Sequence, residues 1–135
     1  MDTFYFNNDT FKSTDIYKMF ISENPGIGMI KIRATAARGA IPISGVNVVI
    51  SKIINDAKVI FYEGVTDESG MIECISLPTP SIDLSDDLVI PASTIYTLNI
   101  TDAQDNLNEE YEVRVYDGIC TMQNINVVPY KEGDM

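Results

Sequence analysis

Hydrophobic and polar residues alternate along much of this chain with a period of two, which is the pattern of half-buried β-strands. The clearest alternation begins after Met29. Its expected inward side chains are Ile30, Ile32, Ala34 and Ala36, and its expected outward ones are Lys31, Arg33 and Thr35. A second strand is expected at about residues 46–53, with Val46, Val48 and Ile50 directed into the core.

Turn signals separate this pattern into strands. Pro42 and Gly45 are expected to break regular pairing between the first two strands. A third strand is expected around Val59 and Phe61, and the TDESG sequence that follows favours a tight turn in which Gly70 takes a positive φ.

Four further strands complete the expected set. They are predicted at residues 71–76, 95–101, 110–117 and 122–129. Leu77-Pro78-Thr79-Pro80 is expected to end the first of them, because a proline nitrogen donates no ladder hydrogen bond. Residues 81–93 then form a long acidic connection, and DAQDNLN and DGIC supply the later turns.

Seven strands without an internal helix predict an all-β fold, a seven-stranded Greek-key β-sandwich preceded by an N-terminal arm and a short helix. The length of 135 residues fits one such domain. We therefore divide the chain into an arm with a short helix (1–27), a β-sandwich domain (28–130) and a solvated tail (131–135).

The first 27 residues carry aromatic side chains but are too few to enclose a core, so they must lie against another surface. Ser13 or Thr14 can cap a helix with Asp15 in its first turn, and Asn24-Pro25-Gly26 can end it. Its apolar stripe either covers an open edge or end of the sandwich or docks to a neighbouring subunit, and both hypotheses stay open. The candidate partner-binding residues are Phe4, Tyr5, Phe6, Phe11, Ile16, Met19 and Phe20.

Nine basic against 20 acidic residues give a formal net charge of −11. Such a field repels phosphate backbones and anionic lipid head groups, so neither nucleic acid nor a membrane is expected as a partner. The acidic residues are scattered, which favours a solvated surface over a dedicated cation site. Residues 1–25 contain no apolar stretch of signal-peptide or transmembrane kind, so synthesis in the cytoplasm is expected.

The chain has no histidine, which excludes Ser-His-Asp and Cys-His catalysis and histidine-ligated zinc. Acid pairs such as Asp86 with Asp87, or Glu109 with Glu110, are more simply explained as solvated loop residues than as catalytic carboxylates. No enzymatic activity and no cofactor are therefore expected.

A bound metal ion is also not expected. Asp102, Asp105 and Asn106 place oxygen ligands in one turn, but their spacing is not that of an EF-hand loop and the turn needs no ion to explain it. The two cysteines, Cys74 and Cys120, are expected as reduced thiols packed in or near the core rather than as a disulfide.

Three segments carry a resemblance to a known family: GMIKIRATAARGAIPISGVNVVISK, VIFYEGVTDESGMIECISLPTP and VYDGICTMQNINVVPY. Their order resembles the prealbumin-like, or carboxypeptidase regulatory-like, domain of spore-forming Gram-positive bacteria. The resemblance covers about residues 28–130 and implies a transthyretin- or immunoglobulin-like sandwich. Related modules are appended to spore cortex-lytic enzymes or stand alone among phage-tail-like gene sets.

The resemblance implies a non-enzymatic structural protein that is oligomeric within an assembly. The first hypothesis is a tail or baseplate component of a contractile phage or phage-tail-like particle, whose partners are other structural proteins and whose arm grips a neighbour. The alternative is a spore coat or cortex module, with peptidoglycan as a candidate ligand. A cytosolic enzyme is a third class that rests on the acid pairs alone.

Related adhesin domains also carry a Lys–Asn isopeptide bond beside an acid. The corresponding candidates here are Lys31, Asn124 or Asn126, and Glu73 or Glu112. The alternation directs Lys31 away from the core, whereas that bond needs a buried, neutral lysine, so the bond is not expected.

Overall fold

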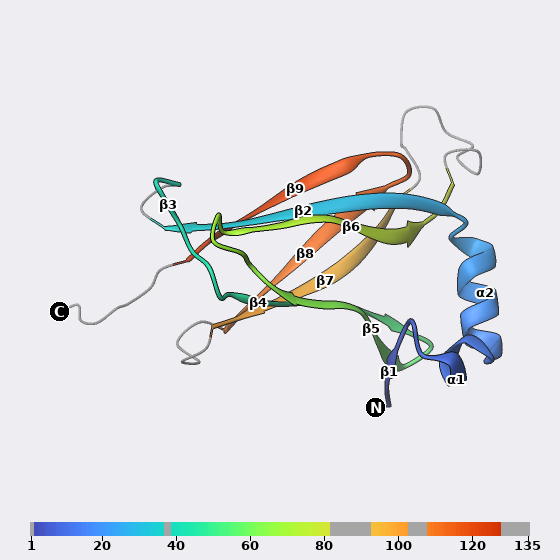
Figure 1. The fold of residues 1–135 in the computed structure, drawn as a ribbon. Coiled ribbons are helices and arrows are strands. Elements are labelled where there is room, and N and C mark those ends of the chain that lie inside the picture. The colour runs from blue at the N-terminus through green and yellow to red at the C-terminus, as the bar shows by residue number, and fades with distance from the viewer. Residues whose placement is uncertain (1, 37–38, 82–92, 103–107, 128–135) are drawn as a thin grey trace.

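A computed structural model describes residues 2–36, 39–81, 93–102 and 108–127. Within these residues, two β-sheets pack face to face, and two short helices lie at one end of the sandwich (Figure 1). The helices are α1 (Asp9–Lys12) and α2 (Asp15–Glu23). The strands are β1 (Thr3–Tyr5), β2 (Gly26–Ala36), β3 (Ile41–Pro42), β4 (Asn47–Ile54), β5 (Ala57–Val65), β6 (Met71–Thr79), β7 (Ser93–Thr101), β8 (Asn108–Tyr116) and β9 (Cys120–Asn126).

The larger sheet, sheet A, has the strand order β1-β5-β4-β7-β8. In the smaller sheet, sheet B, β2 pairs with β6 and β3 in antiparallel and with β9 in parallel. The predicted two-sheet all-β sandwich is therefore confirmed, and each of the seven predicted strands is present with shifted ends. Most of the connection predicted at residues 81–93, most of the predicted DAQDNLN turn (102–108), and the tail lie outside the described residues.

The inward faces of both sheets form one apolar core. The predicted inward residues of β2 and β4, together with Val46 directly before β4, are all at most 5% exposed, as the alternation requires. Tyr96 crosses the core from β7, where its hydroxyl donates to the Pro78 carbonyl oxygen at 2.5 Å. Gly28 brings the sheets close together, because a Cβ there would lie 2.5 Å from the Tyr116 carbonyl oxygen.

Two predictions about strand ends are wrong. β6 continues to Thr79, with Pro78 paired opposite Ile27, whereas the prolines were expected to end it after Ser76. β6 lies at the edge of sheet B along this stretch, so the Pro78 nitrogen has no neighbouring strand to which it must donate. The break around Pro42 also contains a two-residue strand, because Pro42 and Ile41 pair with the end of β2.

The predicted burial of the cysteines is also wrong, since Cys74 and Cys120 are both free and exposed. Cys120 lies beside Met29 on the outward face of β2 and β9. Cys74 has φ +30° and lies where the β2–β6 register shifts, at a bulge that alternation alone does not predict.

Lys31 points outward as predicted, and its Nζ lies 3.3 Å from Glu73 Oε1 on β6. This carboxylate, through its hydrogen bond and its charge, raises the pKa of Lys31. A solvated, charged lysine lacks the burial that an isopeptide bond requires. Thr35, predicted to be outward, is nevertheless only 9% exposed.

Candidate interaction surface

The N-terminal arm contributes one strand, β1, to sheet A. β1 pairs in parallel with β5, Thr3 opposite Lys58 and Tyr5 opposite Ile60. The Phe6 amide continues the ladder by donating to the Ile60 carbonyl oxygen at 2.8 Å. The alternation did not predict this strand, because a three-residue strand is too short to show a period.

Side-chain caps set the limits of both helices. Asn8 Oδ1 accepts from the Thr10 amide at 2.8 Å and so begins α1. Thr14 Oγ1 accepts from the Tyr17 amide at 3.2 Å at the start of α2, and the Asn24 side chain donates to the Phe20 carbonyl oxygen at its end. The predicted cap, first turn and stop of α2 are therefore confirmed.

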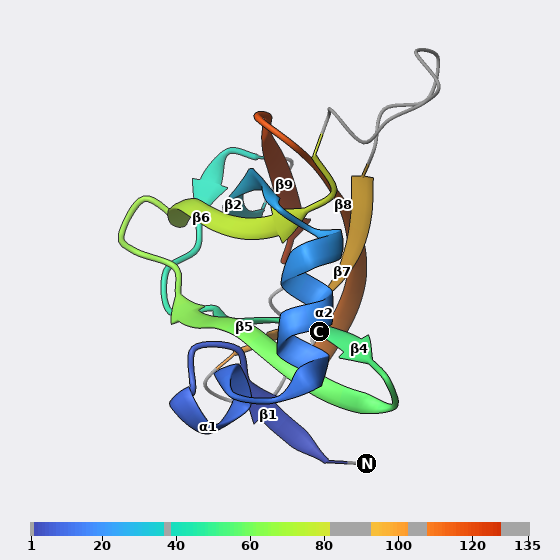
Figure 2. The ribbon, with the colours of Figure 1, turned by 90° about the vertical axis from the view of Figure 1, so that its right-hand side faces the viewer.

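An aromatic cluster fixes the arm and α2 to the sandwich. The Phe6 ring stacks on Phe61 of β5 and meets Phe20 of α2 edge-on, with centroids 6.0 Å apart. Phe61 in turn meets the buried Tyr96 edge-on at 5.0 Å, so the cluster continues into the core. Figure 2 shows α1 and α2 lying across this end of the molecule beside β1 and β5. Phe20 of the helix stripe therefore packs on the sandwich, whereas Met19 of the same stripe is exposed, so both hypotheses about the stripe stay open.

The seven candidate partner-binding residues separate into two groups. Phe11 and Phe20 are buried, at 1% and 5% exposure, and Phe4, Phe6 and Ile16 are half-buried. Tyr5 and Met19 are exposed, at 50% and 57%. Docking to a neighbour stays a prediction, and these two side chains are the members most available for it.

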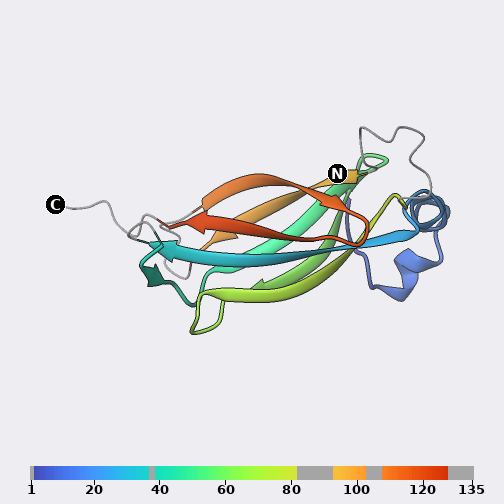
Figure 3. The same ribbon diagram turned by 90° about the horizontal axis from the view of Figure 1, so that it is seen from above.

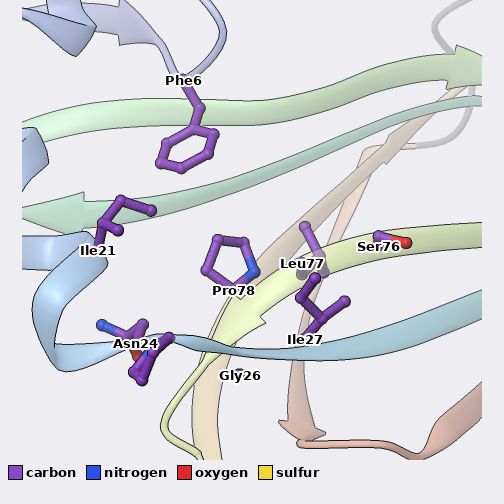
Figure 4. A pocket seen from close by; sticks show the side chains of 9 residues that line it. Phe6, Ile21, Asn24, Gly26, Ile27, Ser76, Leu77 and Pro78 are labelled. Atoms are coloured by element: carbon purple, nitrogen blue, oxygen red, sulfur yellow. The ribbon is translucent and has the colours of Figure 1, made fainter.

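A mostly apolar groove of about 290 Å³ opens beside the carboxyl end of α2 (Figure 4). Its lining residues are Phe6, Ile21, Asn24, Pro25, Gly26, Ile27, Ser76, Leu77 and Pro78. Ile27 is 58% exposed at its margin, and its amide donates to Asp117 Oδ1 at 3.2 Å. Ile27 is not among the predicted partner-binding residues, although it precedes Met29 and Lys31 on the outward side of the same alternation.

The described polar groups near this end include the amine of Lys52. Lys52 is half-buried, and its Nζ donates to Thr94 Oγ1 and to the Ile95 carbonyl oxygen, each at 2.8 Å. Desolvation lowers the pKa of Lys52, and its Nζ lies 5.3 Å from the centre of the Tyr96 ring. These contacts hold the amine against neutral oxygens and an aromatic face.

Within the described part of the chain, no three histidine, cysteine or acidic side chains gather closely enough to hold a metal ion. The candidate calcium turn cannot be placed, because Asp105 and Asn106 lie outside that part. Neither described helix has the length and apolar character that a membrane span needs.

Comparison with known proteins finds similarity at the level of the fold. No family model and no curated protein matches the chain. Among solved structures, transthyretin from Sparus aurata is similar, with 18% identity, a TM-score of 0.46 and coverage of 74% of this chain and 88% of that one. Sea bream transthyretin in complex with thyroxine gives 17% identity, a TM-score of 0.45 and coverage of 75% and 87%. The solved structures similar to this chain are thus transthyretin-like β-sandwiches, whereas the spore and phage-tail context stays a prediction.

Proposed function

We propose that this chain is a non-enzymatic assembly subunit, a tail or baseplate component of a contractile phage or phage-tail-like particle, which docks to neighbouring subunits at its α2 end. One observation carries the proposal. Ile27 remains exposed at the margin of the apolar groove, and Tyr5 of β1 and Met19 of α2 are exposed outside its lining, although the aromatic side chains of the arm pack on the sandwich.

The groove is suited to an apolar side chain of a neighbouring subunit. Its walls come from α2, β2 and β6 and are held by the caps and the aromatic cluster, so binding orders few additional groups. Each methylene that a neighbour buries there contributes about 0.8 kcal/mol. A branched or aromatic side chain from the neighbour would therefore supply several kcal/mol.

Catalysis has little support from the residues that line the groove. None of them is an acid, a lysine or a cysteine, and Ser76 has no histidine to activate it because the chain contains none. The neighbouring carboxylate of Asp117 accepts a backbone hydrogen bond from Ile27, which gives it a structural role.

The test is quantitative mass spectrometry on two purified fractions of the source cells, tail-like particles released after prophage induction and mature spores. We expect recovery with the particles in a fixed ratio to the other tail proteins. Recovery with spores alone would overturn the tail assignment in favour of the spore coat or cortex alternative. Absence from both fractions would overturn the assembly function.

Two single substitutions then test whether docking occurs at the α2 end. Ile27→Asp places a charge at the groove margin and is expected to reduce recovery in particles at least tenfold, because a buried, unpaired charge opposes docking. Val65→Asp is the matched control, since Val65 is 54% exposed at the other end of β5 from the residues that pair with the arm. Equal recovery of both variants would contradict docking at the α2 end.

A further inference from the structure

Among the described residues, each sheet ends in strands whose outer backbone groups pair with no further strand, and such edges invite pairing with another chain unless they are protected. Sheet A ends in β1 and β8, and sheet B ends in β9 on one side and in β6 with β3 on the other. Figure 3 shows β2 between β6 and β9 in sheet B. The four edge strands β1, β6, β8 and β9 differ sharply in their protection.

Three of these edges carry known protective features. β1 has only three residues. β6 contains Pro78 and a bulge at Cys74, where φ is +30°. β8 carries four charged side chains among its nine residues. They are Glu109, Glu110, Glu112 and Arg114.

β9 has none of these features. Its seven residues, CTMQNIN, include no charge and no proline. Its register with β2 is unbroken from Met29 opposite Cys120 to Thr35 opposite Asn126. β9 is therefore a regular, uncharged edge of seven residues.

Two hydrogen bonds at the ends of this ladder establish which β9 groups face outward. The Met29 amide donates to the Ile119 carbonyl oxygen at 3.0 Å, and the Val127 amide donates to the Thr35 carbonyl oxygen at 2.8 Å. In a parallel pair, alternate residues of a strand bond to the same neighbour, so the odd-numbered residues of β9 bond to β2. The even-numbered residues direct their amides and carbonyls to the open edge.

No described backbone group pairs with that outward row. The outward carbonyl of Asn124 accepts instead from the side-chain amide of Gln123 at 3.1 Å. The side chains beside the edge include Met122 and Ile119, which are 44% and 51% exposed. An incoming strand would thus find both hydrogen-bonding groups and apolar surface.

We propose that β9 accepts an extended segment of a partner protein as an additional strand of sheet B, a segment in which apolar residues alternate and whose net charge is positive. The positive charge follows from the formal charge of −11 on this chain, which attracts a basic segment and opposes a second copy. The inference rests on the proposed assembly function and adds a second joint to it, distinct from the α2 end.

The first test is amide hydrogen exchange of the isolated protein, followed residue by residue by NMR. The Met122 and Asn124 amides should exchange at least a hundredfold faster than those of Gln123 and Ile125, which bond to β2. Equal protection of all four would mean that the edge is already paired, by residues 128–135 or by a second copy, and would overturn the proposal. A dimer in light scattering would overturn it as well.

The second test is binding of a nine-residue peptide of alternating lysine and valine, acetylated and amidated, measured by fluorescence anisotropy. We expect saturable binding that protects the Met122 and Asn124 amides. Met122→Pro removes an outward donor and should weaken binding at least tenfold, whereas Met122→Thr keeps the backbone and should stay within threefold. No binding, or equal binding by both variants, would overturn strand addition.

Two peptide controls keep the test independent of whether Met122→Pro folds. The same peptide with every backbone amide N-methylated presents no row of donors and should bind at least tenfold more weakly. A peptide of alternating glutamate and valine should also bind more weakly, and equal binding would overturn the basic partner. These measurements need no particle, so a negative result would not contradict docking at the α2 end. Failure of the particle experiments would likewise not contradict strand addition at β9.

Discussion

The ring of Phe6 stacks on the ring of Phe61, with centroids 4.5 Å apart and planes 25° apart. This contact joins the N-terminal arm to β5 and links the cluster around α2 to the core. It explains how an arm too short to enclose a core becomes ordered. The arm extends the core of the sandwich instead of forming its own.

Phe6→Ala is therefore expected to lower the free energy of unfolding by about 2 kcal/mol, less than for a fully buried phenylalanine because Phe6 is half-buried. Tyr5→Ala is the control, because Tyr5 is 50% exposed, and should change stability by no more than about 0.5 kcal/mol. Urea unfolding followed by circular dichroism measures both. Equal effects would show that the stacked rings do not hold the arm.

Gly28→Ala tests the close approach of the two sheets. The added Cβ would lie 2.5 Å from the Tyr116 carbonyl oxygen and closer still to the Val115 side chain, so β2 and β8 would have to separate. We expect the free energy of unfolding to fall by about 3 kcal/mol, in the upper part of the usual range for overpacking, because the backbone cannot move aside as a side chain can. Thermal unfolding measures it.

Gly118→Ala is the matched control for that substitution. Gly118 has φ +76° and nothing within 4 Å of the added Cβ, so only backbone strain opposes the methyl group. Gly118→Ala is therefore expected to lower the free energy of unfolding by about 1 kcal/mol. If Gly118→Ala cost as much as Gly28→Ala, close packing of the sheets would not be the cause.

The sequence predicted the strands whose inward positions alternate over several residues, because burial of one face demands that period. It also predicted α2, since Thr14 and Asn24 are local signals that tertiary contacts did not override. The end of β6 could not be predicted in the same way. Whether Pro78 stops a strand depends on whether that strand lies at an edge, and strand order is not a local property.

The candidate site was predicted less completely than the fold. The sequence identified an apolar arm but could not tell that Phe11 and Phe20 are buried by residues of the chain itself. Ile27 was missed because it was placed at the end of the arm, before the predicted start of the first strand, whereas β2 begins at Gly26. The groove is formed by residues distant along the chain, Phe6, Ile27 and Pro78 among them, and their proximity follows only from the sheet pairing.

High pH is expected to destabilise the fold through Tyr111. Burial, together with a hydrogen bond to Glu109, raises the pKa of Tyr111 from 10.0 to about 12. Between these values the unfolded chain releases the proton and the folded chain retains it, so stability is full below pH 10 and falls as the pH rises through 12. Burial also raises the pKa of Tyr96, which acts in the same direction.

Urea unfolding at pH values from 8 to 12 measures this dependence. Tyr111→Phe should make the decline above pH 10 shallower without removing it, because Tyr96 remains. Between pH 8 and 9 the free energies of unfolding of the unsubstituted protein and of Tyr111→Phe should depend on pH in the same way. Identical slopes above pH 10 would contradict a Tyr111 pKa that is raised by folding.

The β4–β5 hairpin offers a stabilising substitution. Asn55 and Asp56 have φ values of +49° and +65° and lie between the paired residues Ile54 and Ala57, as in a two-residue turn with both central φ values positive. Glycine is favoured at the second position of such a turn, so Asp56→Gly should raise the free energy of unfolding by about 0.5 kcal/mol. The relief of backbone strain in the folded state exceeds the stabilisation that glycine gives the unfolded chain through its greater conformational entropy. Asp56→Val should lower it by about 1 kcal/mol, because a β-branched residue resists positive φ. Urea unfolding should therefore rank the residues at position 56 as Gly above Asp above Val, and a less stable glycine variant would mean that the Asp56 side chain itself supports the turn.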